Sequence, residues 1–259
     1  MIIPNEPMAG FKKHKLKIPS PSTINEYVGY KSKWCLRKIF GYTFPTDCKM
    51  MRGTCSDKGA GLVLEKKNTE QGAVVEMLKQ FDEKCNESMK DYDKERKNIK
   101  KCIEKSVDEL TKTYGNFLSF QSEVVGVIGG YKYHGYTDFI FQDEKTGKKV
   151  VVDLKTTLRT PSQLKSAHAR QISLYSHALG CDAVLLYIIP LKDTTKAIWW
   201  EVSDKQKYLD ECVEILKSMD LLLYNCNDKY EVAKMCYPNA DDFFWSEPEI
   251  EARKKVWGI

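Results

Sequence analysis

Two aspartates and a lysine have the residue types and the spacing that chemistry at a single site requires. Asp153 and Lys155 are two residues apart in Val-Val-Val-Asp-Leu-Lys, so on a β-strand their side chains point to the same face. Asp138 lies in a second apolar segment, ahead of a polar turn that contains Gly147. Apolar, β-branched runs on both sides of such a turn predict a β-hairpin, which brings the three side chains onto neighbouring strands.

The register of this hairpin decides whether the two aspartates meet. If the turn closes symmetrically between Lys145 and Thr146, Asp138 lies directly opposite Asp153, with Cβ atoms about 5 Å apart. A three-residue loop with a bulge at Gly147 would shift the register by one residue. Two close carboxylates repel each other unless a cation lies between them, and hard oxygen ligands select Mg²⁺ or Mn²⁺. The valines before Asp153 indicate a buried strand, where unpaired charge is costly, so the sequence favours a metal site over a surface ion-pair ladder.

A helical segment after the Asp153 strand extends the pattern. Gln171 and Tyr175 are four residues apart in it and therefore share one helix face. An Asp-bearing strand, an Asp-x-Lys-Thr strand and a helix with Gln-x-x-x-Tyr, in this order, resemble the RecB-like branch of the PD-(D/E)XK nuclease superfamily. That branch includes Cas4-type and many phage exonucleases. The resemblance implies a catalytic set made of Asp138, Asp153, Lys155, Gln171 and Tyr175.

An upstream segment, Arg52-Gly53-Thr54 followed by Asp57, resembles the first motif of the same family. In that motif Arg-Gly-Thr precedes a helix that carries a His or acidic metal ligand, and Asp57 stands at the position that is often His. The resemblance implies Asp57 as a metal ligand beside Asp138 and Asp153. The alternative is an acid at the start of a helix, which interacts with the helix dipole. Glu123, in the preceding strand, is a weaker candidate for the same metal.

Basic side chains near these motifs are candidates to contact DNA. His168 and Arg170 flank Gln171, and Arg52 precedes Asp57; the alternative for Arg52 is a solvated surface position. A further basic stretch is interleaved with acids, and it predicts either a DNA track or a solvated helix face. It contains Lys94, Arg96, Lys97, Lys100, Lys101 and Lys105.

The cysteines argue against the iron–sulfur cluster that some members of this family carry. Cys35 lies in a segment similar to the Cys-Pro-Arg-x-Tyr of those proteins, but only Cys226 and Cys236, with nine residues between them, lie near the C-terminus. No Cys-x-x-Cys is present, so the usual cluster spacing is absent. We expect no cluster and interpret Cys35 as a small buried hydrophobe.

The composition limits the classes of protein to which the chain can belong. With 259 residues, 42% of them hydrophobic, the chain can bury one large core or two modest ones. Nine cysteines without a disulfide spacing suit a reducing compartment, and the sequence contains neither a membrane-length apolar run nor a signal-peptide core. We therefore expect a soluble, intracellular protein without a membrane partner. A net charge of +5 permits nucleic-acid binding without proving it.

The expected fold is α/β: an N-terminal helical region followed in the sequence by a restriction-endonuclease-like core. In that core a mixed central sheet is flanked by helices. Residues 1–18 are expected to form an extended basic arm, and residues 19–259 a single domain. Its expected parts are a helical part at about 20–115, a catalytic core at about 116–225 and a tail at 226–259. In the core, single strands are predicted at 117–128 and 131–142, joined by a tight turn at Gly129-Gly130. The tail aromatics, including Phe243 and Trp245, are expected to pack on the core or to stack on bases.

The residues and the resemblance predict a Mg²⁺-dependent deoxyribonuclease, with Mn²⁺ as a substitute metal. An exonuclease is favoured, acting on single-stranded DNA or free DNA ends in recombination, repair or genome processing, in a cell or a virus. Two alternatives stay open. One is a site-specific or structure-specific endonuclease of the same superfamily, and the other is a non-catalytic nucleic-acid-binding module that kept the fold.

Overall fold

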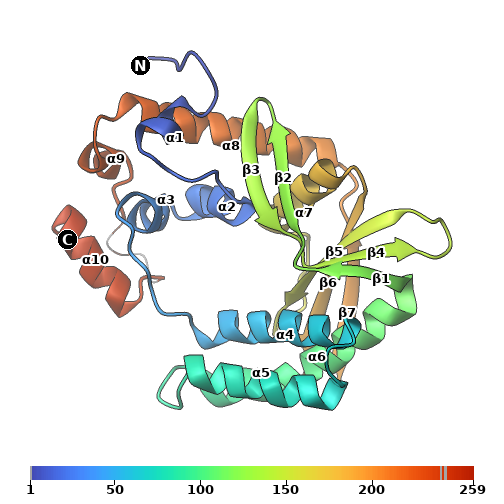
Figure 1. The fold of residues 1–259 in the computed structure, drawn as a ribbon. Helices are drawn as coiled ribbons and strands as arrows, with labels where there is room; N and C mark the ends of the chain where they lie inside the picture. The colour runs from blue at the N-terminus through green and yellow to red at the C-terminus, as the bar shows by residue number, and fades with distance from the viewer. Residues whose placement is uncertain (1, 240, 242–243) are drawn as a thin grey trace. The chain divides into compact units, whose positions relative to one another are not determined.

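The computed structural model describes residues 2–239, 241 and 244–259, so Phe243 lies outside the described residues. The chain groups into two compact units (Figure 1). The terminal unit consists of Met1–Pro45, Val125–Gly135 and Asp204–Ile259, and the central unit of Thr46–Val124 and Tyr136–Ser203. The sequence predicts one domain after residue 18; each unit is described here by itself.

Three helices open the central unit: α4 (Cys48–Leu64), α5 (Glu70–Lys84) and α6 (Tyr92–Tyr114). Side-chain caps start the first two, because Asp47 accepts from Met50 N at 2.8 Å and Thr69 accepts from Gly72 N at 3.1 Å. The polar interval predicted to separate two helices does so between α5 and α6. The helices pack through buried residues at helical spacing, including Met77, Phe81, Ile99 and Ile103.

A five-stranded mixed sheet follows, in the order β1-β4-β5-β6-β7. Its strands are β1 (Gly115–Phe120), β4 (Phe139–Asp143), β5 (Lys149–Thr156), β6 (Asp182–Pro190) and β7 (Thr195–Glu201). Only β5 and β6 pair in parallel, and α7 (Ser166–Leu179) makes the crossover that parallel strands require. The predicted α/β class and the mixed sheet flanked by helices are confirmed.

The two long strands predicted at 117–128 and 131–142 are wrong in one respect, because each is broken in the middle. The first divides into β1 and β2 (Glu123–Ile128), and the second into β3 (Tyr131–Tyr136) and β4; β2 and β3 form a separate two-stranded sheet. Gln121 adopts a φ of 50°, which no regular strand permits, and the breaks face each other through Gln121 N donating to Asp138 O at 3.0 Å. Asp138 therefore lies where the chain enters the main sheet.

The two faces of the sheet differ in chemistry. Phe139, Phe141, Val152 and Leu154 point into an apolar cluster with buried residues of α4 and α6. Because side chains alternate along a strand, Asp153 and Lys155 point to the opposite face. On that face α7 packs against β5 and β6. Asp153 and Lys155 therefore lie on the face that α7 covers, away from this cluster.

The terminal unit contains helices from both ends of the chain. They are α1 (Ala9–Lys13), α2 (Pro21–Gly29), α3 (Lys31–Trp34), a π-helical turn (Cys35–Ile39), α8 (Lys205–Asn225), α9 (Lys229–Met235) and α10 (Glu247–Trp257). Three aromatic residues of the described tail pack here, since Trp245 lies in an apolar cluster with Leu36 and Ala252, against which Phe244 and Trp257 pack. None of the described helices combines the length and the apolarity that crossing a membrane requires.

The N-terminal arm is not extended throughout, contrary to the prediction, because residues 9–13 form α1 against α8. The cause is Asp220, whose carboxylate accepts from Gly10 N at 2.7 Å and from Met8 N at 3.0 Å. Gly10 permits this approach, because a Cβ there would lie 2.3 Å from the Asp220 carbonyl oxygen. A short-range sequence pattern could not reveal an anchor more than 200 residues away.

The packing of α4 against α6 yields a first prediction. A Cβ at Gly59 would lie 2.3 Å from Cδ1 of Ile103, which is completely buried, so Ile103 would have to shift within the packed core. We expect Gly59→Ala to destabilise the protein by about 1–3 kcal/mol through overpacking. Gly53→Ala on the same helix is the control, because its Cβ would meet only Thr156 Oγ1 at 3.6 Å. In urea unfolding, Gly53→Ala should be neutral or should stabilise the protein by up to about 1 kcal/mol. An equal loss of stability in both variants would contradict the prediction.

Candidate active site

The β4–β5 hairpin has the symmetric register. Phe139 pairs with Val152 and Gln142 with Lys149, and the loop closes through Asp143 N donating to Lys148 O at 2.9 Å. One further step of the same register places Asp138 opposite Asp153. The predicted register is confirmed and its one-residue shift is excluded; Gly147, with a φ of 68°, takes the left-handed position inside the loop.

The two facing carboxylates lie in surroundings that disfavour their charge. Asp153 is fully buried, and half-buried Asp138 accepts a hydrogen bond at Oδ2 from Leu154 N at 2.8 Å. Burial, and after it the charge of Asp153, raises the pKa of Asp138 from 3.8 to about 7. Burial also raises the pKa of Asp153, against the opposing effect of Lys155. At neutral pH the pair therefore holds negative charge that a nearby cation would stabilise.

Lys155 supplies one such cation. Its Nζ lies 2.7 Å from Oδ2 of Asp153, and its side chain keeps 22% of its surface exposed. Burial lowers the pKa of Lys155, but the charges of Asp153 and Asp138 outweigh it, so the net shift is upward. Lys155 thus remains charged at neutral pH and reaches from the carboxylate pair towards solvent.

Asp57 belongs to the same electrostatic cluster. It lies in the middle of α4, which begins at Cys48, so the interpretation as a helix-start acid is wrong. Burial, and then the charge of Asp138, raises the pKa of Asp57 well above its ordinary value. Its Oδ1 is buried without a hydrogen-bond partner among the described residues. An unpaired buried carboxylate oxygen is costly and indicates a ligand position.

These aspartates fit a hard divalent cation by their chemistry. Both carboxylate oxygens of Asp153 also lack a hydrogen bond of good geometry within the described chain, although Lys155 Nζ is close. Carboxylate oxygens are the donors that Mg²⁺ and Mn²⁺ take in proteins. No three His, Cys, Asp or Glu side chains of the described residues are gathered into a ready-made cage. A cation would have to draw the three aspartates together against their mutual repulsion.

Helix α7 brings its predicted pair to the same place. Gln171 Nε2 donates to the Tyr175 hydroxyl at 3.4 Å. Tyr175 is buried, and burial followed by the charge of Asp153 raises its pKa, so the phenol keeps its proton. The two side chains form one hydrogen-bonded unit beside the carboxylate pair.

His168 is joined to a residue that the sequence did not single out. Its Nδ1 lies 2.5 Å from the hydroxyl of Tyr187, and Tyr187 on β6 is the register neighbour of Lys155 on β5. Burial, and then the charge of Lys155, lowers the pKa of His168 to about 4, so the imidazole is neutral at pH 7. The pairing of β5 with β6 brings Tyr187 here, and only the register could have revealed it.

Arg52 has a different environment from either sequence interpretation. It is 4% exposed, so it is not solvated, and its guanidinium forms an ion pair with fully buried Glu95 of α6. Nη2 also donates to Thr156 O at 3.0 Å. These partners occupy the group that was predicted to contact phosphate. Arg52 instead connects α6 to the residue that follows Lys155. The sequence does not distinguish Glu95 from the surface acids around it.

Two weaker candidates are placed less favourably. Glu123 begins β2, is exposed, and does not contribute to the pKa shift of any of the three aspartates. The structure therefore does not bring it to the site. Arg170 lies on α7 beside Gln171 but is 8% exposed, which leaves little of it to meet a phosphate.

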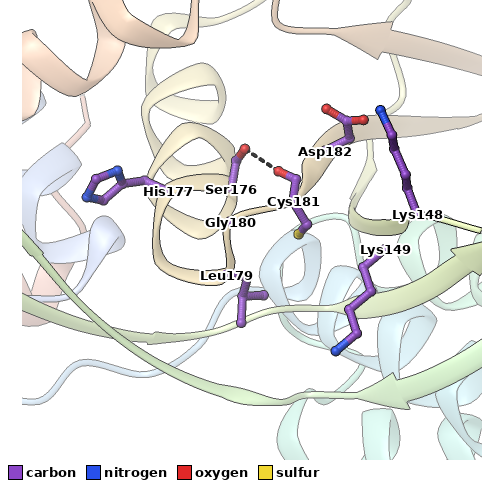
Figure 2. Close-up of a pocket in the computed structure, with 8 residues that line it drawn as sticks. All are labelled: Lys148, Lys149, Ser176, His177, Leu179, Gly180, Cys181 and Asp182. Atoms are coloured by element: carbon purple, nitrogen blue, oxygen red, sulfur yellow. Dashed lines mark hydrogen bonds between the residues drawn. The ribbon is translucent and has the colours of Figure 1, made fainter.

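A visible pocket of the central unit lies away from these residues. Figure 2 shows it between the C-terminal end of α7 and the starts of β5 and β6, with Lys148, Lys149, His177 and Asp182 in its wall. Because β5 and β6 are parallel, Lys149 and Asp182 lie at one end of the pair, and Lys155 and Tyr187 lie towards the other. None of the candidate catalytic residues lines this pocket.

Three cysteines meet in the terminal unit. Cys35 is fully buried, as predicted, and a hydrogen bond with Cys236 contributes most to raising its pKa, followed by burial and by the charges of Cys236 and Cys226. The spacing in the sequence did not predict this proximity. A thiol with a raised pKa remains protonated and unreactive at neutral pH.

The comparisons with known proteins agree with this geometry. The family described as the PD-(D/E)XK nuclease superfamily matches residues 19–253. The chain belongs to the PD-(D/E)XK nuclease superfamily. The predicted superfamily is confirmed.

One solved structure shares the fold of this superfamily member. It is a crystal structure of a candidate exonuclease from Eubacterium rectale, similar with a TM-score of 0.55 and 16% identity, over 96% of this chain and 98% of that chain. A second structure, of the protein SSO0001, has a TM-score of only 0.36 and 14% identity, over 84% of this chain and 92% of that one. No curated protein matches the chain.

The buried ion pair of Arg52 yields a second prediction. Removing one partner leaves an uncompensated charge in the core, so we expect Glu95→Ala to destabilise the protein by about 3–5 kcal/mol. Arg96→Ala is the control, because Arg96 is the next residue of α6 and its ion pair with Asp82 is exposed at both ends. Chemical denaturation should give about 0–1 kcal/mol for this control. Similar losses of stability in the two variants would show that the buried ion pair contributes no more than the exposed one.

The raised pKa of Asp138 yields a third prediction, for protein in EDTA. A folded pKa of about 7 against an ordinary value of 3.8 means that the folded state holds a proton that the unfolded state releases. This contribution to stability is complete below pH 4 and is lost as the pH rises through 7. We therefore expect Asp138→Asn to raise the Tm relative to wild type at pH 8, and to do so much less at pH 5.

Asp143→Asn in the turn of the same hairpin is the control for this pH series. Hydrogen bonds, first from Lys145 N, lower the pKa of Asp143, so it is ionised at both pH values. Its effect on the Tm should be the same at pH 5 and pH 8. A constant Asp138→Asn effect over this range would contradict the assigned shift.

Proposed function

We propose that the protein is a metal-dependent deoxyribonuclease that hydrolyses phosphodiester bonds, acting from DNA ends. The observation that carries the proposal is the facing pair of Asp138 and Asp153, with Lys155 Nζ 2.7 Å from Oδ2 of Asp153, in a member of a nuclease superfamily. Charged groups of both signs, brought together with shifted pKa values, are typical of a site that stabilises charge during a reaction.

The metal would be held by Asp57, Asp138 and Asp153. The buried oxygens of Asp57 and Asp153 that lack a hydrogen-bond partner among the described residues support this assignment, and their chemistry favours Mg²⁺, with Mn²⁺ as a substitute. When bound, such an ion neutralises phosphate charge and lowers the pKa of a bound water. The same three carboxylates would lose their mutual repulsion on binding it.

Lys155 would orient the attacking water and stabilise negative charge that accumulates on phosphate oxygen. Its raised pKa keeps it cationic, and an exposed fraction of 22% leaves part of the side chain accessible. The contact with Asp153 fixes the ammonium in position before substrate arrives. A preorganised charge needs little rearrangement during the reaction.

Gln171 and Tyr175 would position Lys155 or a DNA phosphate rather than exchange protons. The raised pKa of Tyr175 supports this role, because a phenol that keeps its proton can donate a hydrogen bond but is a poor base. His168, neutral and linked to Tyr187, would act in the same way. A neutral imidazole beside Lys155 does not repel the ammonium.

The preference for DNA ends is supported by the similarity of the fold to a candidate exonuclease. Activity on ends would suit recombination, repair or genome processing. A non-catalytic binding module is less favoured, because Asp138, Asp153 and Lys155 are all chemically competent.

The deciding experiment uses end-labelled linear DNA and covalently closed circular DNA. Single-stranded and double-stranded forms of each should be incubated with the protein in Mg²⁺ and in EDTA. We expect linear DNA to be shortened progressively in Mg²⁺ only, and circles to stay intact. Cleavage of circles would identify an endonuclease, and no hydrolysis of any substrate would overturn the nuclease proposal.

The fourth prediction concerns Lys155. We expect Lys155→Ala to keep its fold and its DNA affinity but to lose turnover by at least about a hundredfold, since removing one transition-state stabiliser typically costs about 10²–10³ in rate. Lys149→Ala is the control, because Lys149 is exposed at the other end of the same strand. Single-turnover rates should separate the two, and near-normal cleavage by Lys155→Ala would exclude the catalytic role.

The fifth prediction concerns Asp57. Its Oδ1 has no hydrogen-bond partner among the described residues, so in EDTA Asp57→Ala should not lower the Tm. Turnover should collapse, and Mn²⁺ binding measured by calorimetry should weaken, as it should in Asp153→Asn. Asp57→His should retain partial activity, because imidazole nitrogen can also bind these metals. A lower Tm with unchanged turnover would mean that Asp57 is structural.

A further inference from the structure

The basic residues of α6 fall into two groups. Those of the first group are neutralised by acids: Arg96 lies 2.7 Å from Asp82, and Lys105 lies 2.6 Å from Glu109. Lys100 and Lys112 make ion pairs with Glu104 and Asp108 on the same helix. These residues are therefore solvated and ion-paired, as one of the two sequence interpretations of the basic stretch expected.

Lys94, Lys97 and Lys101 form the second group, and helical spacing places them on one face of the first half of α6. Lys94 and Lys97 are exposed and form no ion pair with any described residue. Lys101 Nζ donates to the carbonyl oxygens of Leu191 and Lys192, each at 2.9 Å, which ties this face to the segment after β6. No acid neutralises these three lysines among the described residues.

This face of α6 forms one wall of a groove of about 380 Å³. The other wall consists of Leu158 and Arg159, which follow β5, and of Pro190, Leu191 and Lys192 at the end of β6. Five cationic side chains line the groove, whereas no acidic side chain and no aromatic ring does so. We call it the basic groove.

The basic groove begins where the strands of the candidate active site end. Lys155 is on β5, and the chain reaches Arg159 of the groove four residues later; Tyr187 is on β6, which ends at Pro190. A second connection runs through side chains. Arg52 joins Thr156, the residue after Lys155, to Glu95, the residue after Lys94. A polymer that crosses the site can therefore continue along the groove.

We propose that the basic groove binds the phosphate backbone of the DNA strand that passes through the active site. The inference deepens the proposed function and rests on it. Regularly spaced cations without acids complement a chain of phosphates. The absence of aromatic rings from the lining means that bases are not stacked there, so the contact is independent of sequence.

The test compares two matched pairs of substitutions on α6. The groove variant is Lys94→Gln/Lys97→Gln, and the control is Lys100→Gln/Lys112→Gln, which removes the same charge from exposed, ion-paired positions outside the groove. Binding of fluorescently labelled single-stranded and double-stranded DNA is measured by anisotropy in EDTA between 50 and 200 mM salt. Cleavage is not needed for this readout, and the Tm of each variant reports its fold.

We expect the groove variant to bind DNA more weakly and to reduce the slope of log K against log salt by about 2, since each lost phosphate contact changes it by about 1. The control should keep the wild-type slope and affinity. DNA molecules of equal length but different base sequence should lose the same affinity for the groove variant. The strand form that shows the larger loss is the form that the groove holds.

Two other outcomes overturn the inference in different ways. If wild type binds and cleaves DNA but the two variants keep equal slopes, the basic groove does not hold DNA and the proposed function stands. If wild type neither binds nor cleaves DNA, the groove inference and the proposed function fail together. Should the groove variant lose stability, Lys97→Gln alone against Lys100→Gln repeats the comparison, with an expected difference in slope of about 1.

Discussion

The structure depends on how negative charge is held inside the central unit. Asp138 and Asp153 face each other across a hairpin whose surroundings disfavour charge, and Asp57 adds a third acid. Lys155, at 2.7 Å from Asp153, and Arg52, which acts on Asp57, oppose this charge. The pKa values of Asp57 and Asp138 nevertheless stay raised, so the charged form of the site remains strained. That strain gives the site an affinity for a dication, and it lowers the stability of the protein when no dication is bound.

Several features keep this strained group in place. The apolar face of the sheet anchors β4 and β5 through Phe139, Phe141 and Leu154, so the polar residues cannot turn inward. Arg52 fixes the end of β5 to α6 through Thr156 and Glu95. The sheet and the helices thus work as a rigid support, and the polar face has only to position side chains.

Much of this site could be predicted because its information is local. The hairpin register follows from the symmetry of one short turn, and the facing of Gln171 and Tyr175 follows from helical spacing. The remainder depended on contacts between distant segments. The Arg52–Glu95 pair, the His168–Tyr187 contact and the Asp220 anchor of α1 each join separate elements, and no local pattern encodes them. The breaks in the long strands could not be predicted, because glutamine, the residue at position 121, is not a residue type that signals a left-handed backbone conformation.

The crossover between β5 and β6 sets an order for assembly of the molecule. The β4–β5 hairpin joins segments that are close in the sequence and can close within about microseconds. Pairing of β6 with β5 is slower, because it has to close the longer loop that contains α7. Asp138 and Asp153 therefore meet early in folding, before the rest of the sheet shields them. Lys155 lies on the same hairpin, so the nascent element carries its own counter-ion and does not have to wait for a metal.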